Sequence, residues 1–162
     1  MVARTGERGM DEKRVAVITG AGGGIGRATA LEMARAGYAL ALCDRDPAAL
    51  ERTAREAGAA VAEVVDVSRA ADVERLLAAC RERLGRVDVL VNNAGILRLG
   101  AWADLTEADW RKTFEVNLLG VTLVTRAFLP LLEASRGHVV NLGSGASLVP
   151  FPGYAAYGPV KV

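Results

Sequence analysis

Residues 14–27 read RVAVITGAGGGIGR, and this stretch decides the fold. Its apolar run at 15–18 has the length and composition of a strand that is buried on both faces. Gly20, Gly24 and Gly26 then crowd a turn, and residues 25–36 contain no helix breaker. A strand, a tight turn and a helix N-terminus bring free backbone N–H groups to one point, which favours a bound diphosphate. The stretch therefore predicts a nucleotide-binding βα unit, although a glycine turn alone is also typical of an ordinary βα connection.

Length and composition favour one domain with a substantial core. The chain has 162 residues, of which 51% are hydrophobic and 5% aromatic, a size suited to a single domain. The 20 basic and 19 acidic residues give a net charge of +1, which indicates neither a nucleic-acid nor a membrane partner. Cys43 and Cys80 lack metal-ligand spacing, so we expect no metal and a cytoplasmic protein with reduced thiols. We also expect no apolar run of membrane-spanning length, and a disordered tail at residues 1–13.

Apolar runs and helical patterns alternate along the rest of the chain. Strands are predicted at residues 15–18, 38–43, 60–65, 87–91 and 138–142, and helices at 25–36, 47–57, 68–84 and 106–135. Asp46 before Pro47 predicts one helix start and Ser68 another, and Thr106 with Asp109 resembles a capping box. This alternation predicts an α/β domain over residues 14–162, Rossmann-like, with a doubly wound parallel sheet covered by helices on both faces.

The predicted helix at 106–135 carries two apolar stripes. One comprises Phe114, Leu118, Val121, Thr125, Phe128 and Leu132, and the other comprises Val116, Leu119, Leu123 and Ala127. A helix that is apolar on two sides is covered on two sides. The sheet is one cover, and the other is either a second subunit or neighbouring helices.

Acidic residues follow two of the predicted strands. Asp44 lies 20 residues after Gly24 at the end of the second strand, where a carboxylate can accept hydrogen bonds from adenosine ribose hydroxyls. Asp66-Val67 ends the third strand on the same edge, where an adenine ring would lie. Each aspartate also has an ordinary interpretation as a helix cap or a turn residue.

Four polar residues in the second half have spacings that suggest chemistry. Tyr157 and Lys161 are four apart, so they share one face of a helix that we expect to begin near Tyr154. Ser144 stands 13 residues before Tyr157, just past the fifth strand, and Asn117 lies inside an apolar helix, an unfavourable position for asparagine. Each residue alone also fits a loop, a solvated surface or a local backbone hydrogen bond.

Taken together, these motifs are similar to those of the short-chain dehydrogenase/reductase family. The resemblance is carried by TGAGGGIG at residues 19–26, Asp66-Val67, NNAG at residues 92–95, Asn117, Ser144 and YGPVK at residues 157–161. It runs from Arg14 to the last residue and covers the first two thirds of such a protein. It implies strand order 3-2-1-4-5 with the family's later strands missing. It also implies hydride transfer between a nicotinamide cofactor and a secondary alcohol or ketone.

The resemblance implies a role for each matched residue. Tyr157 would be the general acid/base, and Lys161 would hold the nicotinamide ribose and lower the tyrosine's pKa. Ser144 would hydrogen-bond the reacting oxygen, and Asn117 would support a water that relays protons. The implied cofactor-binding residues are Thr19, Gly20, Gly24, Ile25, Gly26, Asp44, Asp66, Val67, Asn93, Ala94, Gly95, Tyr157 and Lys161.

Further expectations concern the cofactor, the substrate and the partners. NAD is expected rather than NADP, because Asp44 would face the 2′-phosphate. The apolar loop residues Leu148, Val149 and Phe151 favour a non-acidic, fairly apolar alcohol or ketone as substrate. A full-length form is expected to be a homo-oligomer through helix 106–135. The sequence stops one residue after Lys161. The alternative is therefore a catalytically silent nucleotide-binding or interaction fragment, and we expect the 162-residue polypeptide to bind NAD weakly, self-associate and show no turnover.

Overall fold

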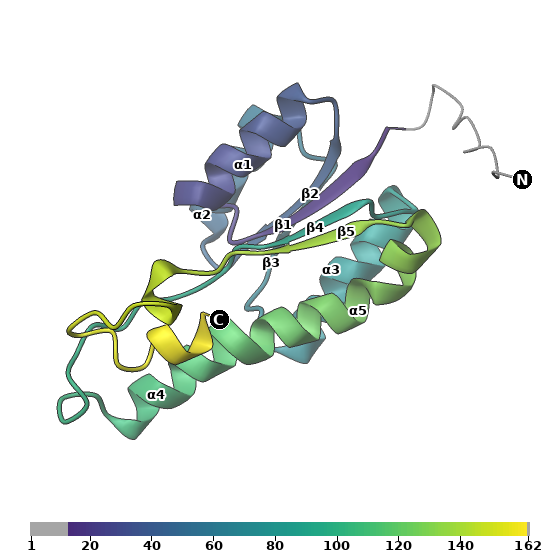
Figure 1. The fold of residues 1–162 in the computed structure, drawn as a ribbon. Helices are drawn as coiled ribbons and strands as arrows, with labels where there is room; N and C mark the ends of the chain where they lie inside the picture. The colour runs from purple at the N-terminus through teal and green to yellow at the C-terminus, as the bar shows by residue number, and fades with distance from the viewer. Residues whose placement is uncertain (1–12, 162) are drawn as a thin grey trace, which may run out of the picture.

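Five parallel strands form one sheet in the order β3-β2-β1-β4-β5, which confirms the expected fold class and strand order (Figure 1). The structure is a computed structural model that describes residues 13–161, so the expected tail lies outside the described residues except for Lys13. The strands are β1 Val15–Thr19, β2 Ala39–Asp44, β3 Val61–Val64, β4 Val89–Asn92 and β5 His138–Asn141. The helices are α1 Gly24–Arg35, α2 Pro47–Ala57, α3 Ala70–Arg83, α4 Glu107–Phe114 and α5 Gly120–Ser135.

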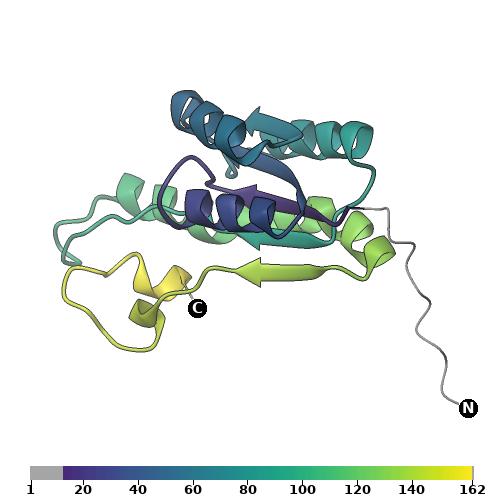
Figure 2. The ribbon, with the colours of Figure 1, turned by 90° about the horizontal axis from the view of Figure 1, so that it is seen from above.

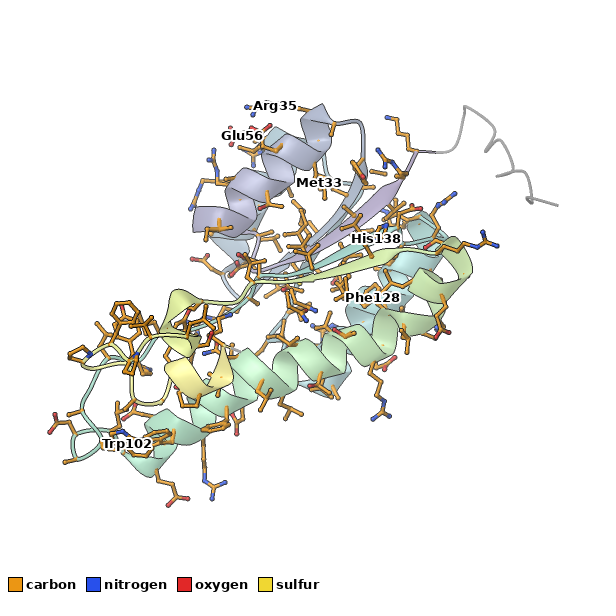
Figure 3. The ribbon with its side chains drawn as sticks, viewed as in Figure 1. Met33, Arg35, Glu56, Trp102, Phe128 and His138 are labelled. Carbon is orange, nitrogen blue, oxygen red and sulfur yellow. The ribbon has the colours of Figure 1, made fainter. Side chains whose placement is uncertain are left out.

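Each face of the sheet has its own hydrophobic core, because side chains alternate along a strand. Ala16 and Ile18 of β1 pack in the core under α1 and α2, whereas Val15 and Val17 pack in the core that α3 and α5 cover. Figures 1 and 2 show the helices in layers on opposite faces of the sheet, and Figure 3 shows Phe128 between α5 and the sheet. β1 is buried along its whole length, as its apolar run predicts.

The predicted helix at 106–135 is continuous but contains a π-helical turn. α4 runs into this wider turn, Glu115–Leu119, which continues as α5. The buried residues of the turn and of α5 are Val116, Asn117, Gly120, Val124, Phe128 and Leu132. The two predicted stripes are therefore partly wrong, and Phe114, Leu118 and Leu119 are exposed. A π turn holds an extra residue and so rotates the residues before it relative to those after it.

By length and composition alone, the helix Glu107–Ser135 could cross a membrane. It has 29 residues, and its most apolar window has a mean hydropathy of 1.4. The expectation that no apolar run has this length is wrong, because Glu115 and Arg126 are the only charges between Thr113 and Leu132. In this fold the inner face of α5 contributes to the core that it shares with α3.

The predicted helix starts are correct in two cases and wrong in one. Asp46 caps α2 and Thr106 caps α4, as the sequence predicts. Ser68 does not cap α3, whose N-cap residue is Arg69 without a side-chain hydrogen bond. The Ser68 hydroxyl donates instead to the carboxylate of Asp66 at 2.5 Å.

The expected helix through Tyr157 and Lys161 is absent. Tyr154 forms an isolated bridge with the loop that follows β4, and a single 3-10 turn, Gly158–Val160, precedes Lys161. Pro159 has no backbone N–H and disfavours the helical conformation of the residue before it. Tyr157 and Lys161 are therefore brought together by a turn and not by one face of a helix.

Candidate dinucleotide-binding and active site

The turn between β1 and α1 requires glycine at several positions. Gly20 has a φ of 65° and Gly24 a φ of 51°, in the left-handed region that disfavours side chains. A Cβ atom on Gly26 would lie under 3.0 Å from the carbonyl oxygen of Gly20 and the side-chain nitrogen of Asn93. Because Gly26 lacks this atom, α1 starts close against the end of β1, and its N-terminal N–H groups stand at the mouth of the turn.

Thr19 and Asn93 tie the glycine turn to the end of β4. The Asn93 side chain donates to the carbonyls of Thr19 at 2.9 Å and Gly20 at 3.0 Å. The Thr19 hydroxyl accepts from the backbone N–H groups of Asn93 at 3.1 Å and Ala94 at 3.0 Å. The turn is therefore fixed by side chains from within the protein, a preorganisation that lowers the entropic cost of binding a ligand.

A cleft of about 330 Å³ lies at the carboxyl ends of the strands, where open α/β sheets bind ligands. The predicted cofactor residues that line it are Gly20, Ile25, Asp44, Asp66, Val67, Asn93, Ala94 and Gly95. The lining residues outside the predicted set are Gly23, Arg45, Val65, Ile96 and Val116. Each of these additional residues lies within a motif or next to a motif residue that the sequence analysis names, and that position was the available signal. Val116, for example, immediately precedes Asn117 on the long helix.

Asp44 holds the glycine turn in addition to lining the cleft. Its carboxylate accepts the backbone N–H of Gly22 at 2.8 Å and that of Asp46 at 3.0 Å. The side chain thus links the end of β2 to the glycine turn and to the start of α2. Its position agrees with a carboxylate at the ribose edge of the cleft, and the binding of a ribose stays a prediction.

Asp66 is held by hydrogen bonds at the end of β3. Its carboxylate accepts from the hydroxyl and the N–H of Ser68 at 2.5 and 3.0 Å, and from the ammonium group of Lys112 at 3.2 Å. Burial acts to raise the pKa of this carboxyl, but the hydrogen bonds from Ser68 and Lys112 outweigh burial and lower the pKa below its ordinary value. Asp66 is therefore an ionised acceptor at neutral pH. Lys112 belongs to no motif, and the sequence analysis missed it.

The hydrogen bonds of the Asn117 side chain explain why an asparagine lies inside an apolar helix. It occupies the π-helical turn, where its side-chain oxygen accepts the N–H of Ile96 and its side-chain nitrogen donates to the carbonyl of Ile96, both at 2.8 Å. The adjacent Gly95 leaves room at this point, because a Cβ there would lie 3.0 Å from Asn117 Oδ1 and 3.4 Å from Lys161 Nζ. The structure therefore brings Asn117, Gly95 and Lys161 together.

Lys161 is buried next to the end of β5. Its ammonium group donates to the carbonyl of Leu142 at 2.8 Å and lies 6.0 Å from the centre of the Tyr157 ring. Burial lowers the pKa of the Lys161 ammonium group. Ser144 is adjacent, because its N–H donates to the carbonyl of Lys161 at 3.3 Å, while its hydroxyl accepts the N–H of Ala146 at 3.2 Å. Lys161 thus lies beside Ser144 and Tyr157. None of the predicted catalytic residues lines the cleft, and Gly95, which does, connects Asn117 and Lys161 to it.

Comparison with known proteins now identifies the family. The family model for the short chain dehydrogenases matches residues 14–162. The chain belongs to this family. Among curated members of the short-chain dehydrogenase family, sepiapterin reductase of Chlorobaculum tepidum is 42% identical over 86% of this chain and 62% of its own length. The 2-(S)-hydroxypropyl-CoM dehydrogenase 3 of Xanthobacter autotrophicus is 39% identical over 93% of this chain and 61% of its own length. The chain thus spans roughly three fifths of these relatives.

Solved short-chain dehydrogenase structures share the fold. An alcohol dehydrogenase from the archaeon Thermococcus sibiricus, complexed with 5-hydroxy-NADP, is 40% identical with a TM-score of 0.86, covering 93% of this chain and 66% of that one. A short-chain dehydrogenase/reductase from Burkholderia phymatum in complex with NAD is also 40% identical, with a TM-score of 0.87, covering 93% of this chain and 56% of that one. Members of this fold therefore bind both kinds of dinucleotide.

Proposed function

We propose that the protein is an NAD(P)-dependent oxidoreductase that transfers hydride between a nicotinamide cofactor and a secondary alcohol or ketone. The observation that supports the proposal is that the side chains of Asn117 and Lys161 both lie close to Gly95. Gly95 also lines the cleft beside the glycine turn. A proton-handling cluster thus adjoins a cleft suited to a dinucleotide. The family's named dehydrogenases and reductases support the same reaction class.

Each side chain near the end of β5 has a separate role in the proposed reaction. A bound nicotinamide ring supplies the hydride acceptor or donor. The Tyr157 hydroxyl takes the proton from an alcohol or gives one to a ketone, and the Ser144 hydroxyl stabilises charge that develops on the same oxygen. The ammonium group of Lys161 is held by the Leu142 carbonyl. Its positive charge stabilises the phenolate form of Tyr157 when the phenol has lost its proton. Asn117 holds the backbone at Ile96.

The rival function is a nucleotide-binding or interaction fragment without turnover. The test is NADH formation by the purified protein with NAD and a panel of secondary alcohols. A groove of about 390 Å³ is lined only by uncharged residues, including Trp102, Phe151 and Tyr154. Figure 3 shows Trp102 on the loop before α4. The panel should therefore favour neutral apolar and aromatic alcohols. NADH formation above the rate without protein supports the oxidoreductase. Tight NAD binding with no turnover across the panel supports the fragment.

We propose that NAD is preferred over NADP. A 2′-phosphate would approach the Asp44 carboxylate, and two unit charges ~4 Å apart repel by about 4 kcal/mol at an effective dielectric constant of 20. Arg45 also lines the cleft and would offset part of this repulsion. Calorimetric titration should show tighter binding of NAD, and Asp44→Asn should improve NADP binding selectively. Asp46→Asn, which changes an exposed carboxylate of the same loop, is the control. Equal affinities in the unmodified protein would contradict the preference.

We also propose a homo-oligomer that forms through the outer face of the long helix. Leu118, Leu119 and Leu129 are 51%, 45% and 43% exposed on this helix, an apolar surface of the kind that subunit contacts bury. Leu123, in contrast, packs against the core and is unsuited to a test. Leu119→Glu should lower the mass measured by light scattering while the circular dichroism spectrum is kept. Ala71→Glu on the exposed surface of α3 is the control, and an unchanged mass for Leu119→Glu would contradict the proposed contact.

We propose a cytoplasmic location because both cysteines are free thiols. Cys43 and Cys80 are both free and buried, and burial raises the pKa of Cys80 to about 12. Unreactive, reduced thiols of this kind agree with a reducing compartment.

A further inference from the structure

The apolar groove of about 390 Å³ is built by two loops that the fold holds together. The loop after β4 contributes Trp102, and the loop after β5 contributes the lining residues between positions 146 and 159. An isolated bridge between Gly100 and Tyr154 joins the two loops, and the N–H of Gly100 donates to the carbonyl of Gly153 at 2.9 Å. The two walls are therefore fixed relative to each other, and the volume between them is within the range of small-molecule sites.

Aromatic contacts lead from this groove to Tyr157. The ring centres of Phe151 and Tyr154 are 5.7 Å apart. Those of Tyr154 and Tyr157 are 5.9 Å apart with the ring planes at 70°, an edge-to-face arrangement that aromatic rings prefer. The N–H groups of Tyr157 and Gly158 both donate to the carbonyl of Tyr154, so the position of Tyr154 is fixed. A substrate whose oxygen reaches the Tyr157 hydroxyl would therefore place the group beside its reacting carbon in the groove.

Trp102 brings a third aromatic ring to the groove from the other loop. Its ring packs against Trp110, with ring centres 4.6 Å apart, and Trp110 is outside the groove lining. Trp102 is nevertheless 72% exposed, so much of its ring is open to a ligand. Because one side of this ring is already packed, a ligand can contact it at a low entropic cost.

The groove favours an aromatic group over a charged one and over a saturated one. None of its lining residues, all of them in the described part of the chain, carries a charge. The Ser147 hydroxyl already donates to the carbonyl of Ser144 at 2.7 Å. A charged group would therefore lose water there without gaining an ion-pair partner. An aromatic ring would contact other aromatic rings in tilted or edge-to-face arrangements, which are more favourable than burial of the same apolar area alone.

We propose that Trp102 is a specificity-determining residue, and that the groove selects alcohols and ketones with an aromatic ring beside the reacting carbon over saturated ones of similar size. The inference rests on the proposed oxidoreductase function and names its substrate class. The ring of Trp102 lies away from the reacting atoms, so it acts on substrate binding and not on proton or hydride transfer.

The experiment measures kcat/KM for the reduction of two ketones with NADH by a full-length form of the protein. Acetophenone carries an aromatic ring, and cyclohexyl methyl ketone carries a saturated ring on the same methyl ketone group. Because conjugation changes the intrinsic reactivity of acetophenone, the change in the ratio of the two kcat/KM values between variants reports on the groove. Trp102→Leu should lower the preference for acetophenone about fivefold, as expected for one lost aromatic pair, mainly through a higher KM. Trp102→Phe should restore most of the preference.

Phe114→Leu is the matched control, because it also removes an exposed ring that packs against Trp110 but lies outside the groove. Its preference should equal that of the unmodified protein. A fall of both kcat/KM values by the same factor in Trp102→Leu would show a merely structural role and would overturn the inference.

A second variant keeps the test decisive if Trp102→Leu fails to fold. Phe151→Leu should then lower the preference for acetophenone, and an unchanged preference would overturn the inference. Reduction of neither ketone by a protein that oxidises other alcohols would overturn the inference alone. No turnover with any alcohol or ketone would overturn the proposed function and the inference with it.

Discussion

Tyr157→Phe, made in a full-length form of the protein, should lower turnover by about 10²–10⁴-fold, the usual contribution of a positioned acid or base, with little change in the Kd for NAD. The substitution removes one hydroxyl and keeps the ring that lies near the Lys161 ammonium group. Because the turn around Tyr157 is held by backbone hydrogen bonds to Tyr154, the local structure should persist. The loss should therefore appear in kcat and not in dinucleotide binding.

The measurement is the rate of NADH formation with an alcohol that the unmodified full-length form oxidises, together with calorimetric binding of NAD. Tyr38→Phe is the matched control, since it also removes one phenol hydroxyl, and the Tyr38 ring lies beneath Arg14 at the far end of β1. Retention of most of the rate by Tyr157→Phe would show that another group handles the proton. A parallel loss in NAD affinity would show that Tyr157 acts by holding the cofactor.

Gly26→Ala should abolish dinucleotide binding and destabilise the fold by about 3 kcal/mol, the upper part of the usual range for overpacking. The added methyl would meet backbone at the Gly20 carbonyl and the Asn93 side chain, and neither can withdraw without losing hydrogen bonds. Asn93 would have to release the carbonyls of Thr19 and Gly20. The start of α1 would then move away from the place where a diphosphate is expected.

Gly23→Ala is the control for this prediction. Gly23 lies in the same turn and has an extended φ of −162°, and a Cβ there would meet nothing within 4 Å. Urea unfolding and NAD titration of both variants should show a large effect at Gly26 and a small effect on stability at Gly23. Similar stability losses at the two positions would contradict the steric explanation.

The sequence by itself determined the fold and much of the cleft. A fully apolar strand, a glycine turn and the alternation of strands and helices are local patterns, and local patterns specify elements and their order along the chain. The crossover rule then restricts how these elements are arranged. Asp44 and Asp66 could be placed on the cleft for the same reason, since the carboxyl ends of parallel strands meet at one edge of the sheet.

Tertiary contacts decided the rest, because they join residues that are distant in the chain. The π-helical turn cannot be predicted from the helix alone, since Asn117 is held by Ile96, 21 residues away. Lys112 carries no local signal, because its partner Asp66 lies 46 residues away on another element. The prediction of a helix through Tyr157 and Lys161 is wrong because a spacing of four residues indicates a shared face only where the backbone is α-helical. The backbone around Pro159 forms a 3-10 turn instead. The periodicity of apolar residues in the sequence predicts the local backbone conformation. Packing between elements then determines which side chains are in contact.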